Sequence, residues 1–427
     1  MRPEARFVQD QCMQVIEDAP CSPQLRDFLL FGDRQSETGV NAGVQSSAWH
    51  GVSQLKSLIA SGYEGIEASD VYLASRTKSL MQFGAHLMFR MARHALCVDL
   101  NWNGYQQVLD QTASDSGTDT VMLPFRQKIL DGQIGVDEIC NQIASVYKHY
   151  RCDCLFLPYV DSFGIRFPVR RIVEQLRQES VVQFTIVDAA QSFGHVDTSE
   201  LVGIADWLVG GTHKWIGSYQ PLGVGIACSD RSQRSIANRL ENAVKSRTLD
   251  DSLLRFLLEL EQGREFCSPE TVNLCPVFAG AGAMQGTPSS SITLPTRIAN
   301  SESVSRIAES HSWTRINASK QFSTGIVLLR SNSKVGSTVS AASFEVAFAD
   351  MGISLTGYAD GLVRLAMPET LLTDQELDHL GKSFERVRYR LEPQDSTAKF
   401  SEPRKALLPT QLSRQASPNA IHARNSH

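Results

Sequence analysis

Two side chains that could carry out chemistry lie at the ends of neighbouring apolar runs. The run Phe184–Val187 ends at Asp188, and the run Trp207–Val209 leads through Gly-Gly-Thr-His into Lys214. A lysine at such a point can form a Schiff base with an aldehyde cofactor. A carboxylate facing a pyridine nitrogen keeps it protonated, so that the ring can accept electrons. The pair therefore predicts chemistry with pyridoxal 5′-phosphate (PLP), and the alternative is a surface lysine beside an ordinary acid.

The same stretch resembles the class V aminotransferase family, which includes cysteine desulfurases, kynureninase, isopenicillin N epimerase-like enzymes and transaminases. The matching features, in order, are Asp188, Gln191, Ala205-Asp206, His213-Lys214 and the glycine-rich Leu222–Gly225. The resemblance covers about residues 65 to 390. It implies an α/β chain of PLP-transferase fold type I, with a mostly parallel sheet flanked by helices and a smaller α+β C-terminal domain. It also implies that Lys214 and Asp188 are catalytic, and that Gln191 and His213 help to bind the cofactor.

The family binds the cofactor phosphate at a helix N-terminus that follows a strand. Here that place is occupied by Ser75, Arg76 and Thr77, where free backbone N–H groups and the helix dipole favour an anion. Arg76 departs from the small residues that are usual in the family, and a plain capped helix is the alternative. Thr212 could add a hydroxyl group to the phosphate site.

The resemblance assigns roles to four more residues. Trp102 stacks on the cofactor ring, unless it is simply a buried tryptophan. Asp161 lies near the cofactor hydroxyl, although an acid there would repel a phenolate oxygen unless it is protonated or points away. Arg364 binds the substrate carboxylate through two parallel hydrogen bonds, a surface ion pair being the alternative. Thr271 lies on a loop that completes the partner subunit's phosphate site, which implies a homodimer.

The periodicity of the chain predicts the elements that position these residues. Short apolar runs alternate with amphipathic stretches from about residue 65 to 230, which indicates an α/β domain. Strands are expected at 71–74, 95–100, 120–123, 154–157, 184–187, 207–209, 224–228, 325–330, 343–348 and 361–366. Helices are expected at 78–92, 137–147, 169–177, 235–245, 252–265 and 373–387, the last with Thr373 and Glu376 in a capping box.

The expected organisation has four parts. Residues 1–45 form an N-terminal segment contributing to the small domain, 46–285 the large PLP-binding domain, and 286–391 the small C-terminal domain. Residues 392–427, rich in Ser, Pro, Gln and Ala, are expected to be disordered. The glycine-rich stretch 280–286 superficially resembles a dinucleotide fingerprint, but its place in the chain favours close helix packing instead.

The composition is that of an ordinary globular protein. The 427 residues carry a net charge of −5, which suggests neither a nucleic-acid groove nor a membrane-surface patch. No run of about 18 to 20 apolar residues occurs, and the N-terminus lacks the apolar core of a secretory signal, so we expect a cytoplasmic protein. The nine scattered cysteines are interpreted as small hydrophobic residues, and no metal site is predicted.

The reaction remains open between several PLP chemistries on an amino acid substrate. Transamination is favoured slightly, and an epimerase or a C–S or C–C lyase is the alternative. No cysteine follows Cys275, which argues against a desulfurase that uses a C-terminal persulfide, and His213 stands where kynureninases carry tyrosine. A non-catalytic protein that keeps the fold for binding is a further alternative.

Overall fold

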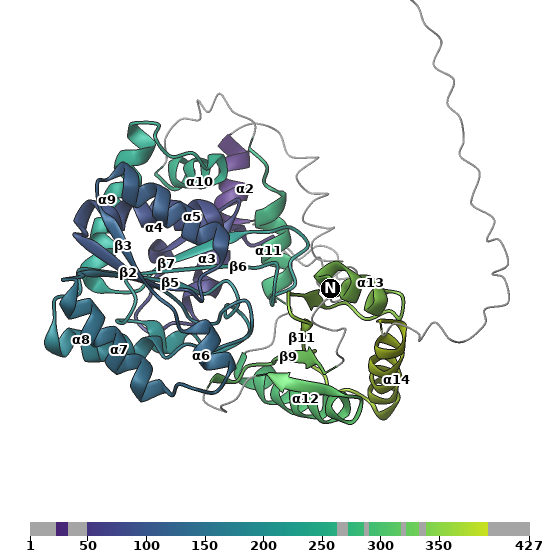
Figure 1. Cartoon of the computed structure of the whole chain (residues 1–427). Helices are drawn as coiled ribbons and strands as arrows, with labels where there is room; N and C mark the ends of the chain where they lie inside the picture. The colour runs from purple at the N-terminus through teal and green to yellow at the C-terminus, as the bar shows by residue number, and fades with distance from the viewer. Residues whose placement is uncertain are drawn as a thin grey trace, which may run out of the picture.

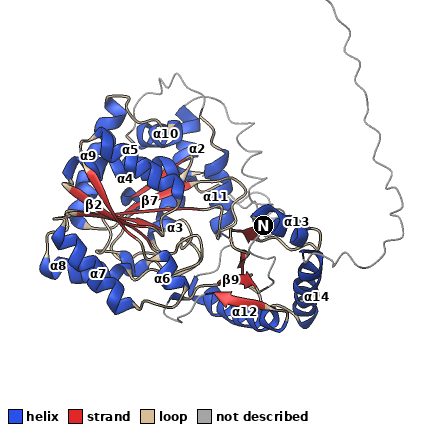
Figure 2. Cartoon of the chain, viewed as in Figure 1, coloured by secondary structure: helices blue, strands red, loops and turns tan. Residues whose placement is uncertain are grey.

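A computed structural model of the chain shows a large and a small domain side by side (Figure 1). It describes residues 23–32, 49–262, 272–285, 290–316, 322–332 and 339–391. In the large domain, helices cover both faces of a central sheet, whereas the small domain packs its helices around a shorter sheet (Figure 2). This is the α/β fold class that the sequence predicts.

The large sheet has seven strands in the order β1-β7-β6-β5-β4-β2-β3. Neighbouring strands from β3 to β6 pair in parallel, and β7 is antiparallel to both β6 and β1. The strands are β1 Val71–Ala74, β2 His94–Val98, β3 Asp119–Leu123, β4 Cys154–Pro158, β5 Phe184–Asp188, β6 Trp207–Gly211 and β7 Gly223–Ala227. All seven strands predicted in this domain are confirmed, so their near-continuous apolar runs reflect a sheet buried on both faces.

Successive residues of each strand face two separate cores. Val71 and Leu73 of β1 pack into one core, and Tyr72 and Ala74 into the other. The first core is covered by α3 Gly51–Ala60, α7 Val136–His149, α8 Val169–Glu179 and α11 Cys275–Gln285. The second core is covered by α4 Thr77–Met91, α5 Asn103–Asp115, α9 Asp230–Lys245 and α10 Ser252–Glu261.

The described part of the N-terminal segment packs on the large domain. Helix α2, Pro23–Phe31, contacts α3 and α10. The indole Nε1 of Trp49 donates to the Phe28 carbonyl at 2.8 Å, and Arg26 Nε donates to the Leu260 carbonyl at 3.3 Å. Residues 23–32 therefore pack on the large domain, whereas the N-terminal segment was expected to contribute to the small domain. The remainder of residues 1–45 lies outside the described residues, as does the tail 392–427.

The small domain contains an antiparallel sheet in the order β10-β11-β9-β8. Its strands are β8 Trp313–Ile316, β9 Ile326–Ser331, β10 Thr356–Gly357 and β11 Leu362–Ala366, and its helices are α12 Ser290–Ser310, α13 Ala341–Ala349 and α14 Asp374–Leu391. The predicted strands at 325–330 and 361–366 and the helix at 373–387 are confirmed. The capping box is present: Thr373 N donates to Glu376 Oε2 at 2.8 Å, and Glu376 N to Thr373 Oγ1 at 3.3 Å.

The expected strand at 343–348 is wrong, because this segment lies in helix α13. Its first four residues, Ser-Phe-Glu-Val, alternate between polar and apolar types, which imitates a half-buried strand. Ser340 instead caps a helix by accepting a hydrogen bond from Ser343 N at 3.2 Å. Phe344 and Phe348, four residues apart, then face the small-domain core, whereas Val346 is 58 % exposed. Helical spacing of the two phenylalanines therefore outweighs the local alternation.

Glycines allow the layers of the large domain to approach closely. A Cβ atom on Gly223 would lie 2.5 Å from the backbone of Arg76, and one on Gly225 would lie 2.5 Å from the Trp207 ring. On Gly280 of α11 it would lie 2.7 Å from Leu222, so the second glycine-rich stretch serves helix packing as predicted. The glycines of β7 thus set how near the start of α4 comes to the sheet.

Five cysteines of the large domain are buried, which fits their interpretation as small hydrophobic residues: Cys97, Cys140, Cys152, Cys154 and Cys228. Cys275 is partly buried, and Cys12, Cys21 and Cys267 lie outside the described residues. No cluster of His, Cys, Asp or Glu suited to a metal ion occurs in the described ranges. None of the described helices is both long and apolar enough to cross a membrane.

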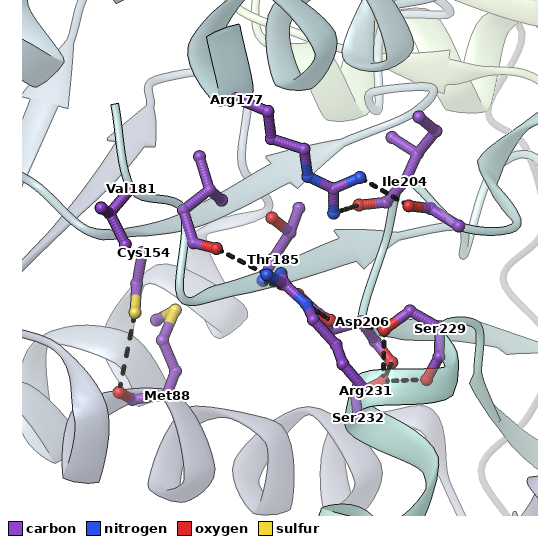
Figure 3. A network of polar contacts seen from close by, with 12 residues as sticks. Met88, Cys154, Arg177, Val181, Thr185, Ile204, Asp206, Ser229, Arg231 and Ser232 are labelled. Carbon is purple, nitrogen blue, oxygen red and sulfur yellow. Dashed lines mark hydrogen bonds and ion pairs between the residues drawn. The ribbon is translucent and has the colours of Figure 1, made fainter. Parts of the chain in front are cut away.

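Asp206 anchors the end of the sheet that lies opposite to the strand ends carrying Asp188 and Lys214. Its buried carboxylate accepts hydrogen bonds from Thr185 N at 2.8 Å, from Ser229 Oγ at 2.7 Å and from both Nε and Nη2 of Arg231 (Figure 3). The acid of the family-like Ala-Asp pair therefore joins β5, β6 and the start of α9.

Replacing Asp206 should destabilise the fold. We expect Asp206→Ala to lower the free energy of unfolding by at least about 2 kcal/mol, because the buried Thr185 N–H and Ser229 hydroxyl lose their acceptor. The control Asp230→Ala, at an exposed position at the start of α9, should cost less than about 1 kcal/mol. Urea unfolding of both variants measures this, and equal losses would contradict the structural role of Asp206.

His195 joins the two domains. Its ring is buried and stacks on Trp215 with ring centroids 3.6 Å apart. Nε2 accepts a hydrogen bond from Gly325 N at 3.2 Å, at the edge of the small domain, and Nδ1 lies 3.0 Å from the Gln191 carbonyl. Burial lowers the pKa of His195 to about 3, so the ring stays neutral in the folded protein.

This buried histidine should make the protein sensitive to acid. An unfolded histidine has a pKa near 6.5, so the unfolded state binds an extra proton between about pH 3 and pH 6.5. Stability is complete above this window and falls as the pH is lowered into it, by about 2 kcal/mol at pH 5. Urea unfolding at pH 7.5 and pH 5.0 measures how much the free energy of unfolding falls between the two pH values. This decrease should be smaller in His195→Gln than in the wild type, while the exposed His86→Gln should behave like the wild type. An undiminished loss in His195→Gln would refute the assignment.

Candidate active site

The carboxyl ends of the parallel strands open onto a cavity of about 990 Å³. Segments that follow β4, β5 and β6 and the first residues of α4 and α5 line the cavity, and the small domain adds residues around β10 and β11. Eight residues singled out in the sequence line it: Arg76, Thr77, Trp102, Asp161, Asp188, Gln191, His213 and Lys214. Arg364 lines it from the small domain.

Asp188 and Lys214 come together because β5 and β6 are neighbours. Asp188 ends β5, where it lies opposite Val209 of β6, and Lys214 follows the end of β6 by three residues. Asp188 is buried, its Oδ1 accepts a hydrogen bond from Ala190 N at 2.8 Å, and burial raises its pKa to about 6 against the lowering effect of Lys214. Burial likewise lowers the pKa of Lys214, although Asp188 opposes this. The lysine is exposed to the cavity, so its amine is accessible.

Gln191 and His213 extend this arrangement. Gln191 is buried, and its carboxamide oxygen accepts a hydrogen bond from Trp215 Nε1 at 3.1 Å. The oxygen is therefore engaged, and the amide NH₂ is the group that Gln191 can offer to a ligand. The His213 side chain is exposed to the cavity, and its partial removal from solvent, followed by the charges of Lys214 and Arg76, lowers its pKa. A neutral imidazole therefore lies beside the lysine.

The N-terminus of α4 can accept an anion. Helix α4 is 15 residues long, its N-cap is Arg76, and no side chain caps its first N–H groups. Arg76 and Thr77 both line the cavity, although Thr77 Oγ1 already donates to the Gly210 carbonyl at 2.7 Å. The uncapped N–H groups and the positive end of the helix dipole suit a phosphate at this point.

Two of the four residues suggested for the phosphate do not line the cavity. Ser75 instead donates to Asp251 through Oγ at 2.5 Å and also through its backbone N–H. Thr212 is fully buried behind the cavity wall, and its Oγ1 has no hydrogen-bond partner among the described residues. An unsatisfied buried hydroxyl costs free energy, so Thr212 retains a hydroxyl for a ligand or water.

Trp102 presents its ring at the mouth of the cavity. It precedes α5 as its N-cap and is 54 % exposed, so it is not the buried structural tryptophan of the alternative interpretation. Its ring meets Tyr105 edge-on at 5.1 Å and lies over Gly104, where a Cβ would be only 2.4 Å away. Gly104 thus allows the indole to fold back across the start of α5.

Asp161 is the second buried carboxylate of the cavity. Its Oδ1 accepts hydrogen bonds from Phe163 N and Ile165 N, both at 2.8 Å, while Oδ2 has no partner among the described residues. Burial raises the pKa of Asp161 to about 7, although Arg126 and Arg364 act to lower it. The acid is therefore partly protonated near neutral pH, which reduces its repulsion of a phenolate oxygen.

Arg364 lies on β11 and reaches across to the large domain, where its Nη1 donates to the Ser162 carbonyl at 2.8 Å. Two further residues of the cavity, Arg126 and Tyr358, were not predicted from the sequence. Arg126 begins α6, Arg126–Leu130, just past the end of β3, and Tyr358 lies beside β10. The position of Arg126 after a strand end was a usable signal, whereas only the tertiary fold brings Tyr358 here. Thr271 lies outside the described residues.

Comparison with known proteins gives fold neighbours alone. No family model and no curated protein sequence match the chain. Similar solved structures include a C-DES mutant with glycine covalently linked to its PLP cofactor (13 % identity, 90 % of this chain and 93 % of that one, TM-score 0.63). Also similar is ureidoglycine–glyoxylate aminotransferase from Bacillus subtilis (14 % identity, 92 % of this chain and 91 % of that one, TM-score 0.60). A third is alanine–glyoxylate aminotransferase from Nostoc sp. (15 % identity, 88 % of this chain and 92 % of that one, TM-score 0.60).

The matches to these neighbours span about nine tenths of this chain, from 88 % to 92 %. The seven-stranded sheet, the helices on both of its faces and the small C-terminal domain agree with them. The chain therefore has the PLP-transferase type I fold of the class V aminotransferases and cysteine desulfurases, as its sequence resemblance implied.

Proposed function

We propose that this protein is a PLP-dependent enzyme that acts on the α-carbon of an amino acid, and that its reaction is transamination. The observation that carries the proposal is the pairing of a buried acid, Asp188, with an accessible amine of lowered pKa, Lys214, at adjacent strand ends of one cavity. The aminotransferases among the fold neighbours support the choice of reaction.

The residues of the cavity fit this cofactor. The uncapped start of α4 would hold the phosphate, Asp188 would face the pyridine nitrogen, and Lys214 would bind the aldehyde carbon. Trp102 offers an aromatic face, and the Gln191 amide and Asp161 suit the ring hydroxyl. When bound, PLP supplies an electron sink for the carbanion formed at the substrate α-carbon.

The side chains of the chain itself divide the remaining work. Arg364 orients the substrate by binding its α-carboxylate, so that the α-carbon faces Lys214. The Lys214 amine, whose lowered pKa leaves it neutral more often, removes the α-proton and can return it elsewhere. Asp188 remains ionised when a cation faces it, because Lys214 already lowers its pKa in the cavity.

A homodimer and a cytoplasmic location remain predictions. The loop around Thr271, which the family resemblance assigns to the partner's phosphate site, lies outside the described residues. A lyase or an epimerase would use the same groups, and C-DES, one of the fold neighbours, is a cystine C–S lyase. The fate of the α-proton and of the amino group separates these reactions from transamination.

The proposed function predicts turnover that needs both PLP and a keto acid. A panel of α-deuterated amino acids, each with and without an α-keto acid, should yield a new amino acid only when the keto acid is present. Lys214→Ala should lose this activity by at least about 10³-fold, because no other group is placed to move the α-proton. Lys128→Ala changes an exposed lysine of α6 that does not line the cavity and is the matched control.

Amino acid analysis and mass spectrometry measure both outcomes. Inversion of the α-carbon, or release of a fragment of the side chain, without any need for a keto acid would contradict transamination and favour the epimerase or the lyase. If the protein catalysed neither deuterium exchange nor turnover of any compound in the panel, that result would contradict an enzymatic role.

A further inference from the structure

Arg126 is a cation of the cavity for which the proposed function has no use. It enters from the large domain at the start of α6, whereas Arg364 enters from the small domain on β11. Neither arginine forms an ion pair with a carboxylate among the described residues, and Arg126 Nε is buried without a hydrogen-bond partner there. A buried donor without an acceptor costs free energy, which an anionic ligand would recover.

The side chain of Arg126 is held in place towards the cavity. Its backbone N–H donates to Asp99 Oδ1 at 2.9 Å, which fixes the first turn of α6. Its guanidinium lies 4.9 Å from the centroid of the Phe163 ring, and its Nη2 makes one long contact, 3.5 Å, to the Asn101 carbonyl. The cation–π contact orients the group and leaves most of its donors available.

The same turn of the chain positions both arginines. Phe163, which contacts Arg126, stacks on Tyr358 with ring centroids 4.5 Å apart. The Tyr358 hydroxyl and Arg364 Nη1 both donate to the Ser162 carbonyl, at 3.0 Å and 2.8 Å. All of these side chains line the cavity, so the turn contacts both guanidinium groups within it.

The described residues of the cavity leave Arg126 without an anionic partner. The cations of the cavity are Arg76, Lys78, Arg126, Lys214 and Arg364, and its carboxylates are Asp161 and Asp188. The proposed cofactor occupies the start of α4, Lys214 and Asp188. Two arginines then face one acid, Asp161, whose Oδ1 is already engaged by two backbone N–H groups. A single α-carboxylate would engage Arg364, whereas Asp161, which we assign to the ring hydroxyl, forms no ion pair with Arg126, and Arg126 Nε would keep no acceptor among the described residues.

We propose that Arg126 binds a second acidic group of the substrate, which makes the substrate an amino acid or keto acid with a carboxylate, or a similar anion, on its side chain. This inference rests on the proposed function of the cavity and specifies its substrate class. Arg364 then recognises the group common to all amino acids, and Arg126 is a specificity-determining residue that selects among them.

Calorimetric titration of the PLP-loaded protein tests the proposal without any turnover. The probes are malonate, succinate and glutarate, each beside its half-amide, because the two members of a pair differ in one negative charge and little in shape. At least one dicarboxylate should bind about tenfold or more tightly than its half-amide. Arg126→Gln should reduce that ratio to about two or less. Lys128→Gln removes an exposed charge from the same helix and should keep the ratio.

Two results would overturn the proposal. In the first, the wild type binds no dicarboxylate more tightly than its half-amide. In the second, the preference for the dicarboxylate persists in Arg126→Gln. Arg364→Gln should weaken both members of each pair, which separates the two arginines. Should the protein fail to take up PLP, the proposed function fails by itself, and the titration of the protein alone still decides whether Arg126 selects a second acid.

Discussion

Burial of the Asp188 carboxylate at the end of β5 is the constraint on which the cavity depends. Removing a charge from water costs several kcal/mol unless polar partners replace the lost hydration. Ala190 N–H and the nearby Lys214 are the partners in the protein, and they still leave the pKa of Asp188 raised to about 6. A cationic ring nitrogen would complete this environment. The acid is thus stable as an anion chiefly when a cation faces it, which is the property that a PLP site requires.

The sheet brings this acid and its lysine together by close packing. Gly211 and Gly223 admit Thr77 and the backbone of Arg76 to positions that a Cβ atom would fill. The start of α4 can therefore lie beside the strand end that leads to Lys214. On the opposite side, the small domain closes the cavity with Arg364 and Tyr358. The contact between His195 and Gly325 links the turn of Gln191 to that domain, so cofactor and substrate groups are held in one frame.

The sequence predicted the sheet and the core of the site well, for physical reasons. Strands buried on both faces appear as apolar runs, and residues just beyond parallel strands must meet at one edge, which brought Asp188, Gln191 and Lys214 together. Prediction failed where tertiary contacts decide. Ser75 stands next to the phosphate candidates in sequence, yet its hydroxyl turns to Asp251, which is 176 residues away. The alternation in 343–348 imitated a strand, because only packing in the small domain shows that Phe344 and Phe348 share a helix face. Tyr358 joins the cavity through a contact between domains.

The most direct test of the central assignment is to locate the cofactor on the chain. The protein is incubated with PLP, reduced with borohydride, digested and mapped by mass spectrometry, since reduction fixes a carbon–nitrogen double bond as a stable link. The structure predicts one modified peptide, with the added mass on Lys214, and no addition at Lys78, which lines the same cavity. Modification at Lys78 or at scattered surface lysines, with Lys214 unmodified, would contradict the account.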